Sequence, residues 1–287
     1  MPDPAASDDI AYQFLRDIAR DLSQKELKFP TFIDASLGVR MALSKKDLNA
    51  VELAKVVRSE PLLSARLVAL ANSAALNAGG REITDLKNAL IIVGHNAVRS
   101  LAVSLAMEQI AHAKELKPFA QQCRELWEHS LEVASIAYVL ARRRGTPDPD
   151  EALFAGLVHD LGHFYLLWRA TGFPELVKRG DDLRALVRDW HPGIGAALLQ
   201  NLDLPETITR AVDEHELAPA TLQPGGLAEL LSVSDRLSKS RGVALPPEMT
   251  EPPAEGAPEG ALDEQTARAI LKEAAEDVHS LAAILKG

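Results

Sequence analysis

The chain has 287 residues, of which 47% are hydrophobic and 25% are charged, and its net charge is −10. This composition predicts a globular protein with one large or two smaller domains, and its acidity disfavours nucleic acid as a partner. The lone cysteine, Cys123, excludes an internal disulfide and favours a cytoplasmic location. The acidic N-terminus has no apolar core of a secretory signal, and without an uninterrupted run of about 18 apolar residues we expect no membrane span.

Helical periodicity runs through almost the whole sequence, and the alternating patterns of strands are nearly absent. Residues 1–27 are expected to hold one amphipathic helix, over 8–22. Shorter helices are expected up to about residue 188. The other expected helices span 33–43, 50–58, 61–74, 85–93, 95–112, 118–143, 152–160, 191–201, 205–217 and 226–240. The pattern therefore predicts an all-α fold.

Residues suited to helix caps mark several of these boundaries. Thr84 is expected to cap the helix that follows it, and Gly94 to end that helix in the left-handed conformation. Asp148 followed by Pro149 is typical of a helix start, because proline lacks only an N–H that has no partner at the first helical position.

The composition changes over residues 243–261, where Pro, Glu, Gly and Ala dominate and no apolar period survives. Such a segment predicts a flexible linker. An apolar helical stripe resumes in residues 262–287, which predicts a C-terminal helix. We favour docking of this helix on its own chain, because a tethered helix has a high effective concentration, and pairing in a homodimer is the alternative.

Histidine and aspartate residues recur in a combination that suits a divalent metal ion. They are His129, His159, Asp160, His191, His215 and Asp235. Imidazole and carboxylate ligands fit Fe, Mn, Zn or Ni, and an oxygen-rich set also fits Mg. A helical bundle builds a core metal site from ligands on several helices. Such a site would activate water for attack on phosphate esters.

Each of these residues, taken alone, has a simpler interpretation. His129 lies on an apolar helix face, where a buried and hydrogen-bonded core histidine is the commoner case. His159 and His191 fit helix ends equally well. His215 between two glutamates fits an exposed histidine, and Asp235 fits a surface ion pair. The combination, more than any single residue, predicts the metal site.

The order of these features resembles the HDOD branch of the HD metal-hydrolase superfamily. The features that carry the resemblance are SEPLLSARL at 59–67, with Glu60 where aspartate is usual, ANSA at 71–74, WEHS at 127–130, AGLVHDLG at 155–162, and then His191, His215 and Asp235. The resemblance covers residues 28–241, which we interpret as one HDOD domain.

The resemblance implies an HD-superfamily-like helical bundle preceded by an HDOD-type N-terminal helical subdomain. It also implies which residues bind metal: His129, His159, Asp160 and Asp235 form the HD set, and His191 and His215 take the positions of a second metal or of the pocket. The usual role of the family is regulatory, in bacterial signalling. Signalling proteins or a small nucleotide-type ligand are therefore the expected partners.

The pattern of the catalytic relatives is incomplete in this sequence. His163 stands where HD-GYP enzymes have lysine, Glu214 stands where many relatives have the first of two histidines, and the Gly-Tyr-Pro motif is absent. The expected function is therefore a regulatory module with a vestigial or intact metal site. The alternative is a metal-dependent phosphohydrolase acting on nucleotides or related phosphate esters.

Overall fold

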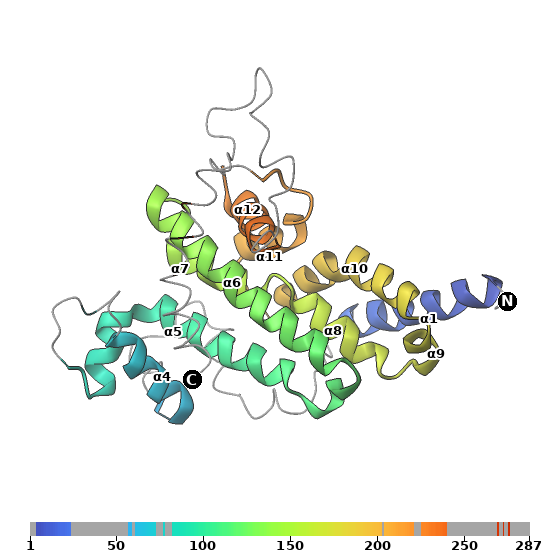
Figure 1. Ribbon diagram of the computed structural model, residues 1–287, viewed down its shortest axis with the longest axis horizontal. Coiled ribbons are helices and arrows are strands. Elements are labelled where there is room, and N and C mark those ends of the chain that lie inside the picture. The colour runs from blue at the N-terminus through green and yellow to red at the C-terminus, as the bar shows by residue number, and fades with distance from the viewer. Residues whose placement is uncertain are drawn as a thin grey trace, which may run out of the picture.

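The computed structural model describes residues 4–23, 57–58, 61–72, 82–202, 204–220 and 225–239, and four isolated positions. Within these ranges every regular element is a helix, which confirms the all-α prediction (Figure 1). The helix expected over 33–43, most of the helix expected over 50–58 and the linker expected over 243–261 lie outside the described residues. So does the helix expected over 262–287, apart from three isolated positions.

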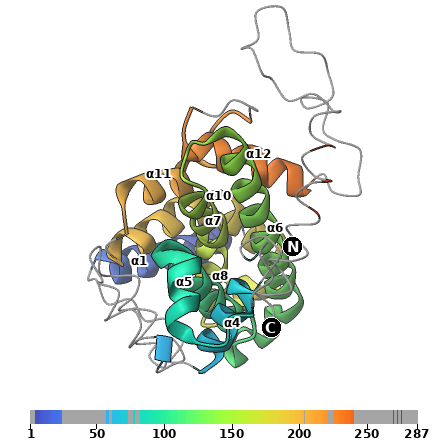
Figure 2. The same cartoon turned by 90° about the vertical axis from the view of Figure 1, so that its left-hand side faces the viewer.

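The described part of the chain folds into a bundle of helices. They are α1 (Pro4–Ser23), α4 (Pro61–Ala71), α5 (Leu86–Ala111), the 3-10 helix η2 (Lys114–Phe119), α6 (Ala120–Arg144), α7 (Pro149–Val158), α8 (Leu161–Ala170), α9 (Pro174–Lys178), α10 (Gly180–Asn201), α11 (Glu206–Glu214) and α12 (Leu227–Lys239). α6 contacts α7 and α12, while α8 and α11 pack on α10. Figure 2 shows α4 beside α5 at one end of the molecule and α11 and α12 at the other.

Helix α5 consists of two helical segments joined at Gly94. The predicted break at Gly94 is confirmed, and its φ of 78° is positive as expected. Its ψ of 164° lies outside the left-handed helical region, so the predicted left-handed cap itself is not formed. The prediction that Thr84 caps the helix is wrong. Asp85 is the cap, and its carboxylate accepts the backbone N–H of Asn88 at 2.9 Å. Both residue types cap well, so the sequence did not distinguish these neighbours.

By length and composition alone, α5 is apolar enough to cross a membrane, although Asn96 and Arg99 interrupt its apolar run. In this fold, 56% of its most apolar window is buried against other helices. The apolar residues of α5 are explained by the protein core, because packing against other helices removes them from water.

Helix α10 joins segments that the sequence predicted as separate helices. It runs without interruption through Pro192, so the predicted break between residues 188 and 191 is wrong. Proline lacks the N–H that would bond to the carbonyl four residues earlier, on Arg188. The Nδ1 atom of His191 lies 2.8 Å from that carbonyl oxygen. The imidazole N–H therefore replaces the missing backbone donor, and the helix continues.

One apolar core connects α1 with the central helices. Phe14, Leu131 and Phe164, from α1, α6 and α8, are all essentially inaccessible to solvent. Cys123 is also buried, and burial raises the pKa of its thiol to about 11. The thiol is therefore a packing group and not a nucleophile at neutral pH.

Candidate metal centre

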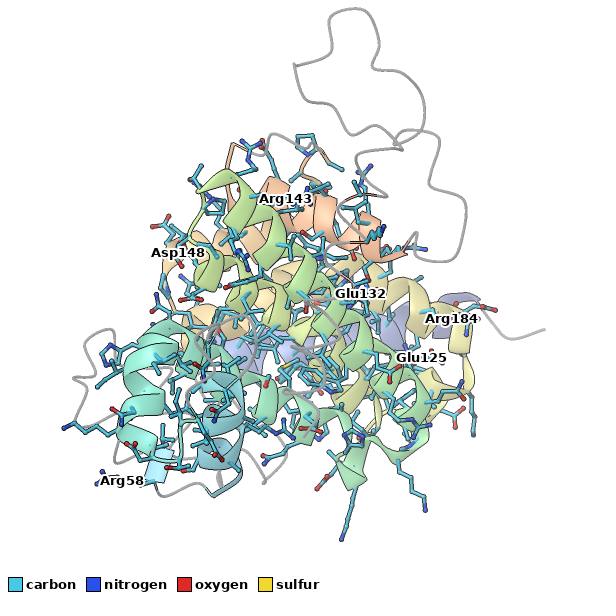
Figure 3. All side chains as sticks on the ribbon, turned by 60° about the vertical axis from the view of Figure 1, so that its left-hand side comes forward. Arg58, Glu125, Glu132, Arg143, Asp148 and Arg184 are labelled. Atoms are coloured by element: carbon cyan, nitrogen blue, oxygen red, sulfur yellow. The ribbon has the colours of Figure 1, made fainter. Side chains whose placement is uncertain are left out.

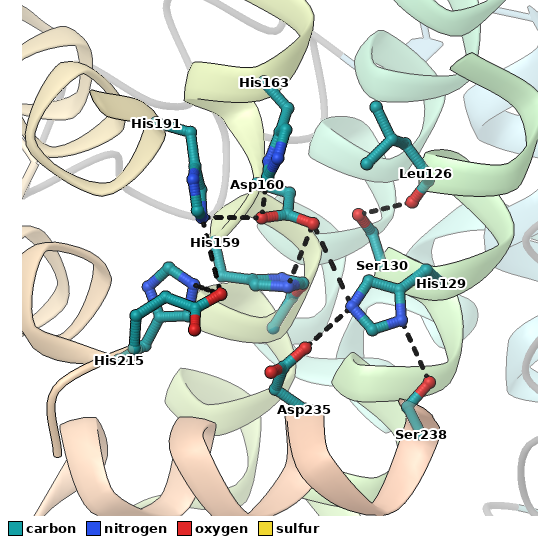
Figure 4. A network of polar contacts seen from close by, with 12 residues as sticks. Leu126, His129, Ser130, His159, Asp160, His163, His191, His215, Asp235 and Ser238 are labelled. Atoms are coloured by element: carbon teal, nitrogen blue, oxygen red, sulfur yellow. Dashed lines mark hydrogen bonds and ion pairs between the residues drawn. The ribbon is translucent and has the colours of Figure 1, made fainter. Parts of the chain in front are cut away.

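The structure brings all six predicted residues to one place (Figure 4). They come from six helices or helix ends: His129 from α6, His159 from the end of α7, Asp160 from the start of α8, His191 from α10, His215 from the end of α11, and Asp235 from α12. Five of the six side chains are buried, and only that of His129 is partly exposed.

The first group is the predicted HD set. The Nε2 atom of His129 lies 2.9 Å from Oδ1 of Asp235 and 3.9 Å from Oδ2 of Asp160. The Nε2 atom of His159 lies 3.4 Å from the same Oδ2. Ligand atoms of His129, His159 and Asp160 all lie within 4.8 Å of one another. Ligand atoms that bind one ion at about 2.0–2.2 Å are separated from one another by distances only slightly shorter than these.

A second group shares Asp160 with the first. Ligand atoms of Asp160, His191 and His215 also lie within 4.8 Å of one another. The Nε2 atom of His191 is 3.5 Å from Oδ1 of Asp160, whereas the first group contacts Oδ2. The two oxygens of this carboxylate therefore face two adjacent positions for a cation.

Local helix geometry orients the three most buried histidines. In each of them Nδ1 contacts a backbone carbonyl of its own helix that has no amide partner. At the ends of α7 and α11 these carbonyls are the unpaired ones of the last turn, and in α10 the carbonyl is the one that Pro192 leaves unpaired. The contacts are His159 to Gly156 at 2.7 Å, His191 to Arg188 at 2.8 Å, and His215 to Val212 at 2.7 Å.

These contacts determine which ring nitrogen is available to a ligand. A carbonyl oxygen only accepts, so Nδ1 carries the proton and Nε2 carries the lone pair in the neutral ring. The Nε2 atoms of His159, His191 and His215 are buried and have no hydrogen-bond partner among the described residues. Each such atom costs about 1–3 kcal/mol unless something fills the site. The donor set therefore fits a divalent cation, which binds neutral imidazole and carboxylate.

His129 is oriented by a relay of side chains. Its Nδ1 lies 3.1 Å from Oγ of Ser238, and that hydroxyl donates its own proton to Oε2 of Glu132 at 2.8 Å. The hydroxyl oxygen therefore accepts a hydrogen bond from Nδ1 of His129. This contact orients the imidazole ring so that Nε2 faces Asp235. The sequence analysis missed both orienting residues. Their spacing in the sequence could have indicated them. Ser238 lies three residues after Asp235, and Glu132 lies three residues after His129, so each shares a helix face with a predicted ligand.

The two aspartates are held in their ionised form. Burial would raise the pKa of Asp160, but the imidazoles of His159 and His163 keep it well below its usual range. Burial also opposes ionisation of Asp235, yet the hydrogen bond from His129 lowers its pKa to about 2. Both carboxylates are therefore charged at neutral pH and available to a cation.

Two of the buried imidazoles, those of His159 and His191, are held neutral. Burial lowers the pKa of His159 to about 4 and that of His191 to about 3. His129 behaves differently, because burial opposes its charge but the hydrogen bond to Asp235 and the charge of Asp160 outweigh burial and raise its pKa. Metal ligands must be deprotonated, so the rings of His159 and His191 already have the required form.

Two cationic or ionisable neighbours had no predicted role. His163 donates from Nδ1 to Oδ1 of Asp160 at 3.0 Å, and its ring stacks on His191 with centroids 3.8 Å apart. Lys239 places Nζ 2.6 Å from Oδ2 of Asp235 and 3.3 Å from Oε1 of Glu216. The i, i+4 spacing of Lys239 from Asp235 was the sequence signal for this pair.

Gly162 allows α8 and α10 to meet beside the cluster. A Cβ atom at this position would lie 2.0 Å from the carbonyl oxygen of His191 and 2.8 Å from the backbone nitrogen of Gly195. Such separations are far below any normal contact. The absence of a side chain at Gly162 therefore lets Asp160 and His163 reach His191.

An open pocket of about 370 Å³ lies over the cluster. Its lining comprises Gln122, Glu125, Leu126, His129, Asp160, His163, Arg188, His191, Glu216 and Lys239. Members of both ligand groups therefore face the pocket, where a small molecule has access to them.

The family model of the HDOD domain matches residues 29–218, more than half of the chain, and the chain therefore belongs to the HDOD family. A curated relative, an uncharacterized protein from Treponema pallidum (strain Nichols), is 22% identical over 219 residues. The matched region covers 70% of this chain and 40% of the relative, so the chain spans less than half the length of that protein.

Solved structures share the fold. A candidate metal-dependent phosphohydrolase from Shewanella amazonensis SB2B has a TM-score of 0.70 at 21% identity, over 96% of this chain and 99% of that chain. An HDOD domain protein with unknown function from Geobacter sulfurreducens gives 0.60 at 22%, over 98% of both. A candidate signal transduction protein from Marinobacter aquaeolei VT8 gives 0.58 at 22%, over 98% of this chain and 65% of that chain. At these identities the similarity shows the fold alone.

Proposed function

We propose that this chain is a regulatory signalling module that holds a divalent metal ion in the His/Asp cluster and binds a small phosphorylated ligand above it. The observation that carries the proposal is the state of three buried histidines, His159, His191 and His215. Each has Nδ1 fixed on a carbonyl and Nε2 without a hydrogen-bond partner among the described residues. Buried polar atoms are seldom left unsatisfied unless a ligand completes the site.

The residues divide into two sets of ligands. His129, His159, Asp160 and Asp235 would hold the principal ion. His191 and His215, with Asp160 shared, would hold a second ion or contact the ligand. Ions of the Fe, Mn, Zn or Ni type suit this mixture of imidazole and carboxylate, and Mg suits it less well because imidazole dominates.

The ligand is proposed to be anionic because two basic side chains and the proposed metal ion lie at the pocket, although Glu125 and Glu216 also line it. Lys239 and Arg188 line it together with the cluster, and a bound divalent ion adds further positive charge. Phosphate groups bind well to arginine, lysine and divalent ions, since all three interact with phosphoryl oxygens. A nucleotide-type molecule has these groups.

A regulatory role is favoured over catalysis by two positions in the sequence. His163, in place of the lysine of HD-GYP enzymes, donates its Nδ1 proton to Asp160. Glu214, in place of a histidine of many relatives, is exposed, and neither ligand group includes it. Membership of the HDOD family and the similarity to a candidate signal transduction protein support the same role.

Phosphohydrolase activity is the second candidate, and the open pocket favours it. Asp160, His129 and His191 line the pocket, so a substrate bound there would lie next to the metal ligands. A divalent ion, when bound, supplies Lewis acidity and a more acidic water for attack on a phosphate ester. The similarity to a candidate metal-dependent phosphohydrolase supports this alternative.

Elemental analysis of the purified protein tests the proposal. We expect a divalent metal in the wild-type chain and in the control Asp17→Ala, which removes an acid that is paired with Arg20 on α1. We expect none in Asp160→Ala, because the carboxylate shared by both groups is lost. Metal that persists in Asp160→Ala would show that the ion binds elsewhere. With metal present, a panel of phosphate esters separates the module, without turnover, from the phosphohydrolase.

A further inference from the structure

We propose that the ligand of this module carries two anionic groups, one at the metal centre and one on Arg184 and Arg188 of α10. The inference rests on the proposed function, because it assumes that the first anionic group binds at the cluster. It adds the chemical class of the ligand: a small bisphosphorylated molecule with a spacer between its two charged groups.

The first observation is a second pocket that continues the first. The pocket over the cluster shares Gln122, His163 and Arg188 with a neighbouring pocket of about 410 Å³. The far part of this second pocket is lined by Arg184 and Asp181. A groove therefore leads from the metal ligands past His163 to the two arginines.

The second observation is the register of α10. Arg188 and Arg184 precede the proposed ligand His191 by three and seven residues, so all three side chains lie on one face of the helix. At 1.5 Å per residue, the arginines begin roughly 5 Å and 10 Å along the helix from His191. The second anionic group would lie at a comparable distance from the first, which requires a spacer.

The opposite wall of the groove comes from α6. Gln122, Leu126 and His129 lie on one face of that helix at spacings of four and three residues, and Glu125 is beside them. Figure 3 labels Glu125 on α6 and Arg184 on α10. An amide, an apolar side chain and a carboxylate offer an anion little on this wall. The second anionic group is therefore assigned to the α10 side.

Both arginines have only weak ion-pair partners, which a phosphate group can replace. Arg188 donates to its neighbour Asp189 at 2.8 Å, and Arg184 pairs with Asp181 one turn away. The arginine side chains are 73% and 69% exposed, and exposed pairs of this kind are weak. A phosphate can accept two parallel hydrogen bonds from a guanidinium, a stronger arrangement than a surface ion pair.

The test uses alkane bisphosphonates of increasing chain length and matching alkyl monophosphonates, whose C–P bonds resist hydrolysis. Each is titrated by calorimetry into the Mn²⁺-loaded 287-residue chain. The variants are Arg184→Gln, Arg188→Gln and the control Arg143→Gln, an exposed arginine in the last turn of α6 (Figure 3). Metal content is measured after each titration, so that removal of the ion by chelation is detected.

We expect one range of chain lengths to bind roughly tenfold more tightly than the monophosphonate. Arg184→Gln should remove that gain without changing the metal content or the affinity for the monophosphonate, because Arg184 lines only the second pocket. Arg188→Gln should remove the gain and also weaken the monophosphonate, because Arg188 lines both pockets. Arg143→Gln should keep the gain. Equal binding of both classes, or a gain that survives both variants, would overturn this inference and leave the proposed function intact. A protein that binds no metal would overturn both.

Discussion

Gly162→Ala is the substitution with the most direct structural consequence for the metal centre. The added Cβ atom would lie 2.0 Å from the carbonyl oxygen of His191 on the facing helix. The atoms that the new Cβ would meet, the carbonyl oxygen of His191 and the nitrogen of Gly195, belong to the backbone of α10. Rotation of a side chain therefore cannot relieve the clash. We therefore expect α8 and α10 to separate at this point.

The size of the effect follows from the contact distance. Carbon and oxygen atoms in close backbone contacts are about 3.3 Å apart, so the helices must move apart by more than ~1 Å. Overpacking of this kind typically costs about 1–3 kcal/mol, and a backbone obstacle places Gly162→Ala at the upper end. His191 moves with α10 while Asp160 stays with α8. A metal site tolerates deviations of only about 0.2 Å, so affinity for the ion should fall about 10- to 100-fold.

Urea unfolding followed by circular dichroism measures the stability, and calorimetric titration with Mn²⁺ measures the affinity. Gly172→Ala is the matched control, because its Cβ would meet Arg169 at an ordinary 3.5 Å. We expect the control to behave like wild type in both assays. If Gly162→Ala unfolds at the wild-type urea concentration and binds Mn²⁺ as tightly, the contact between α8 and α10 does not position the ligands.

The remaining predictions concern three other residues. Pro192→Ala returns a backbone N–H that competes with the His191 imidazole for the carbonyl oxygen of Arg188. Thermal unfolding should therefore show a more stable protein, because the backbone hydrogen bond is restored. Mn²⁺ should bind about tenfold more weakly, because the His191 ring loses the contact that orients it. Lys239→Met removes the ammonium 2.6 Å from Asp235, and calorimetry should show tighter Mn²⁺ binding but weaker phosphate binding. Burial lowers the pKa of His159 to about 4 from 6.5, so the unfolded chain binds more protons between these values. Urea unfolding of the metal-free protein should show stability falling as the pH drops from 6.5 to 4, and a flat profile would contradict this reasoning.

The sequence predicted those parts of the fold that depend on local signals. Gly94 interrupts α5 with φ 78°, and the carboxylate of Asp148 accepts the backbone N–H groups of Asp150 and Glu151 at the start of α7. Each of these features involves residues within a few positions of one another. Such caps and turns can be identified without knowing what packs against the helix.

The departures arose where a side chain replaced a backbone partner. A proline within a helical pattern usually predicts a break, because the carbonyl four residues earlier loses its N–H partner. At Pro192 that carbonyl belongs to Arg188, and the imidazole of His191 supplies the missing donor. Nothing in the local pattern distinguishes such a histidine from any other. The same contact orients the ring toward the cluster, so the error in the helix boundary and the geometry of the site have one cause.

The candidate site was only partly predictable for a related reason. His129 and Asp235 lie 106 positions apart and meet at 2.9 Å, and helical periodicity carries no information about which helices become neighbours. The combination of ligand types identified the six residues, and resemblance to a family implied how they divide into a metal set and a second pair. Ser238 and Lys239 were missed although both lie within one turn of Asp235, because their importance becomes visible only when α12 is placed against α6.

The carbonyl contacts of the three buried histidines also affect how binding would appear in a calorimeter. Each ring is anchored to its own helix, so the empty and filled sites need the same backbone and nearly the same rotamers. Little apolar surface would then change its exposure to water on binding, and the heat capacity of binding should be close to zero. Two of these anchors need only an unpaired carbonyl in the last turn of a helix and a histidine directly after it. A helix end with that composition is a portable unit, one that would present Nε2 in a defined direction in an unrelated helical scaffold.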